Sequence, residues 1–93
     1  MKYTVHYSSR FKKSLKRAAQ FRGFKKNAFK DVVSDLACGK KLDKSFKDHQ
    51  LKGEMKSFRE CHISPDILLI YQIDDEVLIL TLVNIGSHSQ LFE

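Results

Sequence analysis

Three apolar residues alternate with polar ones near the start of the chain: Tyr3, Val5 and Tyr7. This alternation predicts a short strand over residues 2–7, because successive side chains of a strand point to opposite faces. The apolar positions that follow recur at helical spacing: Phe11, Leu15, Ala18 and Ala19. Ser8 or Ser9 suits an N-cap and Gly23 suits a stop, so we expect the first helix between them.

A second group of apolar positions has spacings of three, four and seven residues: Phe29, Val32, Val33 and Leu36. This spacing predicts an amphipathic helix that begins at about Asn27 and ends at Gly39. Residues 40–53 are mostly polar and are interpreted as a loop. Long loops in compact domains often carry function, so this segment is a candidate part of a site.

The remainder of the chain has the pattern of three strands. The first is expected from about Glu54 to Ile63, and the second is the continuous apolar run Ile67–Ile73. The third, Val77–Ile85, is apolar on both faces. The connections at residues 64–66 and 74–76 are short and polar, which predicts an antiparallel meander.

These elements predict an α+β fold: a strand, two helices and a three-strand meander, with both helices packed on one face of the sheet. Residues 1–93 are expected to form one domain. No apolar run approaches the ~20 residues of a membrane span, and the N-terminus lacks a secretory signal, so we expect a cytoplasmic protein with no membrane partner. Cys38 and Cys61 form no CxxC pair, and we expect two reduced thiols in or near the core.

Charge divides the chain into two parts. Residues 1–53 hold fifteen Lys and Arg against four Asp and Glu, whereas residues 54–93 hold two against seven. One face of the first predicted helix is basic: Lys12, Lys13, Lys16 and Arg17. A basic half is the electrostatic footprint of nucleic-acid binding, so we interpret this helix face as an RNA contact. A solvated helix surface and a surface covered by an acidic protein are the alternatives.

The side chains able to move protons gather in the second half of the chain: His49, Glu60, His62, Asp66 and His88. Alternation along the predicted strand places Glu60 and His62 on one face, ~6.5 Å apart at a rise of ~3.3 Å per residue. A carboxylate and an imidazole at that separation can flank one phosphate. Asp66 lies at the turn just beyond, and Arg59 points to the opposite face.

RNA cleavage without a metal needs a base for the ribose 2′-OH, an acid for the departing 5′-oxygen and donors that stabilise the phosphorane. Histidine suits the first two roles because its ordinary pKa lies near neutrality. Each candidate also has a plain structural interpretation: His49 and His88 as surface side chains, and His62 as a partner of Glu60 or Asp66. No HxxxH or CxxC spacing supports a zinc site, so we expect neither metal nor cofactor.

Three segments carry a family resemblance. KDHQLKG (residues 47–53), FRECHISPDILLIY (58–71) and GSHSQLF (86–92) are similar to motifs of the YafQ-like branch of the RelE/ParE superfamily of bacterial toxins. The resemblance covers residues 47–92, while the helical half matches only in pattern and charge. It implies a RelE-like fold, endonucleolytic cleavage of mRNA, usually on the ribosome, and silencing by a cognate antitoxin protein.

The resemblance also implies residue roles. Four residues fall on catalytic positions of the family: His49, His62, Asp66 and His88. Glu60 falls where some relatives carry Asp, and its extra methylene could shift its role from proton transfer to positioning. Phe92 falls on an aromatic that contacts substrate, and we add Arg59 as a substrate contact. Ile67 stands where several relatives have Trp, which argues against base stacking there.

The sequence therefore predicts an mRNA endoribonuclease of a type II toxin–antitoxin pair that acts at the ribosome by metal-independent acid–base catalysis. One alternative is a toxin of the same fold that binds a protein target such as gyrase. The histidines at motif positions argue against it. The other is a plain RNA-binding module with structural histidines, which the lack of aromatic RNP-type strands disfavours.

Overall fold

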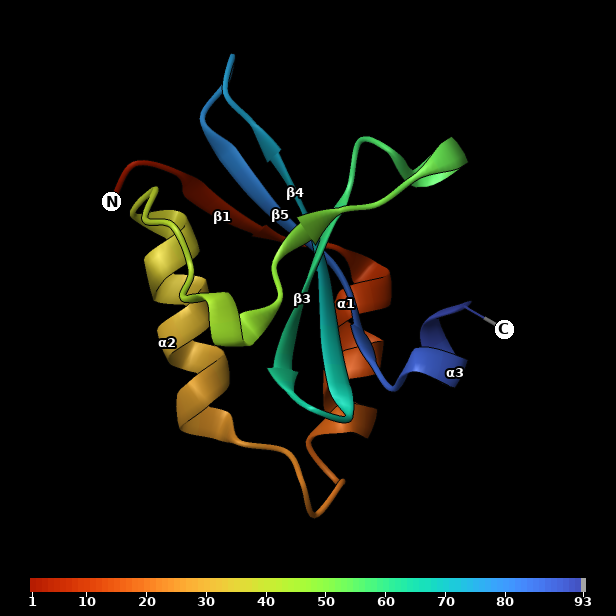
Figure 1. Cartoon of the computed structure of the whole chain (residues 1–93). Coiled ribbons are helices and arrows are strands. Elements are labelled where there is room, and N and C mark those ends of the chain that lie inside the picture. The colour runs from red at the N-terminus through yellow and green to blue at the C-terminus, as the bar shows by residue number, and fades with distance from the viewer. Residues whose placement is uncertain (93) are drawn as a thin grey trace.

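The computed structural model describes residues 1–92 of the chain and contains one mixed sheet with helices against it (Figure 1). The helices are α1 (Ser9–Ala18), α2 (Lys26–Ala37) and the short α3 (His88–Phe92). The strands are β1 (Thr4–Tyr7), β2 (His49–Gln50), β3 (Arg59–Ser64), β4 (Ile67–Asp74) and β5 (Ile79–Gly86). Two 3-10 turns, Lys44–Phe46 and Gly53–Met55, flank β2.

The five strands follow the order β1-β5-β4-β3-β2 across the sheet. Strands β3, β4 and β5 pair antiparallel, which confirms the predicted meander. The N-terminal strand β1 pairs parallel with β5 and forms one edge. The other edge is β2, a two-residue strand antiparallel to β3. The site described below lies on the side of the sheet where β2 meets β3.

Both predicted helices form, with boundaries that follow local chemistry. Ser8 is the N-cap of α1, and its hydroxyl accepts a hydrogen bond from the Phe11 amide at 3.0 Å, as expected. The helix ends at Ala18 rather than near Gly23, because hydrogen bonds spanning three residues close its last turn early. Helix α2 ends just before Gly39, whose φ of 76° suits glycine.

Three sequence expectations were wrong in the second half. The polar loop over residues 40–53 contains β2 and a 3-10 turn. The first meander strand begins at Arg59 and not at Glu54, because Gly53, with a φ of 67°, opens a second 3-10 turn that leaves the extended conformation. The last strand begins at Ile79 because Leu78 adopts a left-handed φ of 55°.

The main core lies between the helices and one face of the sheet. It is built from apolar side chains of α1, α2 and the central strands, of which the most deeply buried are Phe11, Val32, Cys61, Leu69, Leu80, Leu82 and Ile85. Both helices therefore cover the same face, as predicted. Cys61 and Ile63 point into this core from β3, so strand alternation leaves Glu60 and His62 on the opposite face.

The two cysteines differ in environment. Both are free thiols, and Cys61 is buried as expected, but Cys38 is exposed. The expectation of two thiols in or near the core is wrong for Cys38, because it caps the end of α2 beyond the apolar stripe. Among residues 1–92, no helix combines the length and the apolar character that crossing a membrane would require.

Candidate active site

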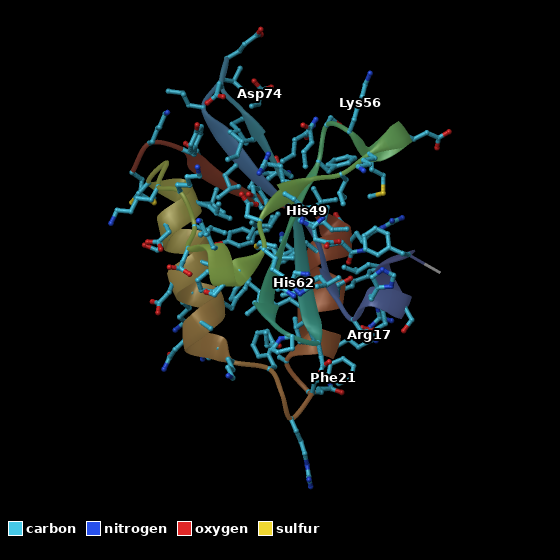
Figure 2. The ribbon with its side chains drawn as sticks, in the orientation of Figure 1. Arg17, Phe21, His49, Lys56, His62 and Asp74 are labelled. Atoms are coloured by element: carbon cyan, nitrogen blue, oxygen red, sulfur yellow. The ribbon has the colours of Figure 1, made fainter. Side chains whose placement is uncertain are left out.

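Glu60 is a buried carboxylate between two histidines. The pairing of β2 with β3 places His49 directly opposite Glu60, and His62 shares the same face of β3. The Nε2 atoms of His49 and His62 lie 3.6 and 3.8 Å from the same Glu60 oxygen, Oε1. The Glu60 side chain is only 7% exposed, while both rings remain accessible from solvent. Figure 2 shows the two histidines near the middle of the molecule, on β2 and β3.

The orientation of the His49 ring follows from its second nitrogen. Nδ1 lies 2.7 Å from the Lys47 carbonyl oxygen. Because a carbonyl only accepts hydrogen bonds, Nδ1 carries a proton and donates it, which leaves Nε2 to face Glu60. The Glu60 carboxylate lies 3.6 Å from that Nε2 atom. The ring is thus held at two points.

A groove of about 520 Å³ adjoins this cluster. Four of the sequence-predicted residues line it: Glu60, His62, Asp66 and His88. They come from β3, from the turn between β3 and β4, and from the first residue of α3. His49 does not line the groove and reaches it only through Glu60. The structure thus gathers imidazoles and carboxylates from three separate segments around one space.

Helix α3, which sequence reasoning missed, positions His88. The Ser87 amide donates to the Gln90 side-chain oxygen at 3.0 Å, and the Gln90 amide donates to the Ser87 hydroxyl at 3.3 Å. This reciprocal pair is a capping box, and the Ser-x-x-Gln spacing of residues 87–90 is the signal that could have predicted the helix. A side chain at Gly86 would meet the Gln90 oxygen at 2.7 Å, so Gly86 provides room for the cap.

Phe92 packs against His88. Their ring centroids lie 5.0 Å apart at a tilt of 42°, one helical turn from each other in α3. Phe92 is also one of the exposed large apolar residues of the chain. This contact restrains the His88 ring, and Phe92 itself does not line the groove.

Arg59 lies away from the groove, in a network with Asp48 and Tyr71. Its guanidinium donates to the Asp48 carboxylate at 3.0 Å, and the buried Tyr71 hydroxyl donates to the other oxygen of the same carboxylate. The hydrogen bond to Asp48 raises the pKa of Arg59, while burial, followed by the same carboxylate, raises the pKa of Tyr71. Asp48 immediately precedes His49, so the network anchors the start of β2 to β3 and β4.

The basic residues predicted on α1 are all exposed: Lys12, Lys13, Lys16 and Arg17. None of them lines the groove. They form a charged surface on the outer side of the helix whose inner side carries the buried Phe11 and Ala18. This surface lies outside the groove.

Phe21 lines the groove and was not recognised from the sequence. It lies in the connection that follows α1, and the residue is 42% exposed. Figure 2 shows it at the end of the molecule where this connection turns toward α2. In the sequence, Phe21 looks like the last apolar residue of an amphipathic helix. Nothing in the sequence therefore indicates that it lines the same groove as Asp66.

Comparison with solved structures places the chain among small α+β bacterial toxins. A metal-bound toxin from Helicobacter pylori superimposes with a TM-score of 0.87 at 46% identity, over 97% of this chain and 99% of that one. YafQ in the DinJ–YafQ complex of E. coli superimposes with a TM-score of 0.86 at 32% identity, over 98% and 99% of the two chains.

The sequence comparisons specify the family. The family model described as the bacterial toxin of type II toxin–antitoxin system, YafQ, matches residues 3–93. The mRNA interferase toxin YafQ of Escherichia coli K12 is 34% identical over 89 residues, which cover 95% of this chain and 94% of that protein. The chain therefore belongs to the YafQ family of type II toxins, and the family resemblance and the α+β fold are confirmed.

Proposed function

We propose that this chain is a toxin that cleaves mRNA endonucleolytically, at the ribosome and in the cytoplasm, and that a cognate antitoxin holds it inactive. Residues 1–93 act as a single toxin domain. Its E. coli relative bears the name mRNA interferase toxin, and solved structures contain YafQ in complex with DinJ. The formal net charge of +6 supports a polyanionic substrate and an acidic partner.

The groove that adjoins Glu60 carries this proposal. It offers two imidazoles and two carboxylates, with a third imidazole behind Glu60. Histidine is the side chain best suited to give and take protons near neutral pH. When the imidazoles are protonated, their positive charge offsets the carboxylates and favours a bound phosphate. A purely structural role would not need two imidazoles on one accessible groove and a third beside its buried carboxylate.

The proposed reaction is an internal transesterification. A base in the groove removes the proton of the ribose 2′-OH, and the 2′-oxygen attacks the adjacent phosphorus. The bond from phosphorus to the 5′-oxygen breaks, and an acid gives that oxygen a proton. The products are a 2′,3′-cyclic phosphate and a 5′-hydroxyl, with no water consumed. His62 and His88 are the candidates for base and acid, and His49 positions Glu60 through the contact at 3.6 Å.

The remaining residues have supporting roles in this proposal. Asp66 orients an imidazole or accepts a proton at the β3–β4 turn, and Phe92 restrains His88 and borders the substrate. Glu60 acts by positioning and charge, since its side chain is only 7% exposed and its Oε1 atom lies near both imidazoles. The α1 surface contacts RNA phosphates of the ribosome or message. Arg59 pairs with Asp48 and thereby holds the start of β2, which carries His49, against β3.

The proposal needs no metal, although the Helicobacter pylori relative is described as metal-bound. Among residues 1–92, no three His, Cys, Asp or Glu side chains are grouped so that they could hold a metal ion. A metal-activated water would hydrolyse the phosphodiester without the ribose 2′-OH, which gives different RNA ends. The two mechanisms are therefore separable by product analysis.

The test is growth inhibition and mRNA cleavage by His62→Ala and His88→Ala, expressed at matched levels without antitoxin. Loss of a general acid or base should slow cleavage by about 10²–10⁴-fold and abolish toxicity. His6→Ala is the matched control, because His6 is exposed on β1 and does not line the groove. Full cleavage by both variants would contradict the assignment. Toxicity without any mRNA cleavage would favour the toxin that binds a protein target.

A further inference from the structure

Phe21 is an aromatic residue of the groove that has no role in the acid–base chemistry. It lines the same space as Glu60, His62 and His88, but it has no group that can carry a proton. The residue is 42% exposed, so an aromatic side chain is accessible from solvent in the groove of the candidate catalytic residues. Pro65 of the β3–β4 turn lines the groove too. Apolar side chains therefore line part of the groove, and polar side chains line the rest.

A single-stranded RNA can fill both parts of such a groove, because it carries charged phosphates and flat bases. Its phosphates match charged and hydrogen-bonding groups, and its unstacked bases match aromatic rings. Ile67, which stands where several relatives have Trp, is buried in the main core and cannot stack on a substrate base. Phe21 supplies an exposed ring from a different segment, the connection after α1.

We propose that Phe21 is the stacking platform for a nucleobase next to the scissile phosphate. This inference rests on the proposed ribonuclease function and names the part of the site that holds a base. Phe21 thereby sets the position of the ribose relative to His62 and His88. Stacking tolerates all four bases, with stronger stacking for purines, so Phe21 contributes affinity and placement and only a modest base preference.

The first experiment measures cleavage kinetics on mRNA programmed on ribosomes for wild type, Phe21→Ala, Phe21→Leu and Phe21→Trp. Phe21→Ala and Phe21→Leu should both raise KM by about 5- to 150-fold, the range that removal of one base–aromatic stack produces. Phe21→Trp should restore wild-type KM, because it retains an aromatic face, whereas Leu retains only apolar bulk. Tyr7→Ala, which removes an exposed aromatic outside the groove, should leave KM unchanged.

The second experiment uses binding, so that it does not depend on cleavage. His88→Ala, with and without Phe21→Ala, is titrated with fluorescent hexaribonucleotides that carry one abasic nucleotide at successive positions. With Phe21 present, one position should show an affinity loss of about 5-fold or more when its base is absent. In the Phe21→Ala background, that position-specific loss should disappear, because the ring that the base contacts is gone.

The two proposals fail in different ways. If wild type does not cleave mRNA, the proposed function fails, and the binding experiment still decides the role of Phe21. If wild type cleaves and Phe21→Ala has the same KM, the stacking inference alone is overturned. Equal hexaribonucleotide affinity with and without Phe21, an unchanged abasic effect, or no measurable binding by either protein would also overturn it.

Discussion

His49 and Glu60 face each other across β2 and β3, with His49 Nε2 3.6 Å from Glu60 Oε1. His62 approaches the same oxygen at 3.8 Å. One buried carboxylate therefore interacts with the imidazoles of two different strands. This relationship makes Glu60 the shared contact of the two imidazoles, and Glu60 also lines the groove.

Glu60→Gln should impair cleavage and leave the fold intact. The amide retains the shape of the side chain but removes the carboxylate oxygen that faces the Nε2 atoms of His49 and His62. We expect kcat to fall by about 10²-fold, the lower end for loss of proton-transfer function, with a urea unfolding midpoint close to wild type. Glu54→Gln, which alters an exposed acid in the nearby 3-10 turn, is the control. An unchanged kcat in Glu60→Gln would show that the shared carboxylate has no part in the reaction.

Asp48→Asn should destabilise the protein by about 1–3 kcal/mol, because it weakens hydrogen bonds to a guanidinium and to a buried hydroxyl. Urea unfolding of Asp48→Asn, Tyr71→Phe and the double variant measures the coupling between the two residues. Exposed Asp31→Asn should change stability by less than about 0.5 kcal/mol. Additive effects of the two single variants would contradict the shared network.

Reversing the charge of the α1 surface should weaken RNA binding in a salt-dependent way. In the variant with Lys12, Lys13, Lys16 and Arg17 changed to Glu, the slope of log K against log salt should decrease by about one for each phosphate that the protein no longer neutralises. The control changes four exposed lysines elsewhere to Glu: Lys26, Lys30, Lys40 and Lys41. Both variants have the same net charge, so equal slopes in the two would mean that net charge, and not the α1 surface, governs binding.

The two thiols should differ in reactivity. Burial, with smaller contributions from nearby carboxylates, raises the pKa of Cys61 to about 12 from an ordinary 9.0. At pH 8, Cys61 should resist alkylation in the native state, while the exposed Cys38 reacts. In Cys38→Ser, no thiol should react until the protein is unfolded. Rapid alkylation of native Cys38→Ser would contradict the burial of Cys61.

The same shift has a consequence for stability. Below pH 9, Cys61 is protonated in both the folded and the unfolded chain and contributes no pH dependence. Between pH 9 and about 12, the unfolded chain releases the proton and the folded chain retains it. Stability should therefore fall as the pH rises through that window, and less steeply in Cys61→Ala, measured by urea unfolding at successive pH values.

The periodic parts of the fold could be predicted from the sequence because burial imposes the period. The meander, both long helices and the Ser8 cap follow from spacing and capping chemistry alone. Strand β2 could not be predicted, since its two residues are too few to show alternation. The parallel pairing of β1 with β5 depends on long-range packing that no local pattern encodes.

The residues of the candidate site that lie in the three sequence motifs could be predicted. Glu60 and His62 share a face by strand parity, and the groove gathers Asp66 and His88 beside them. The capping box formed by Ser87 and Gln90 is a sequence signal from which α3 could have been predicted. The position of Phe21 was not readable, because its proximity to the groove arises from how the α1–α2 connection passes the β3–β4 turn.

The chemistry of the RNA ends tests the central claim most directly. RNA cleaved by the wild-type protein is recovered, and its new termini are identified by their response to a 5′ kinase and to a 3′ cyclic phosphatase. Acid–base attack by the 2′-OH predicts 5′-hydroxyl and 2′,3′-cyclic phosphate ends, formed by wild type and His6→Ala and absent with His88→Ala. Ends with a 5′-phosphate and a free 3′-hydroxyl would instead indicate attack by a metal-activated water and contradict the account.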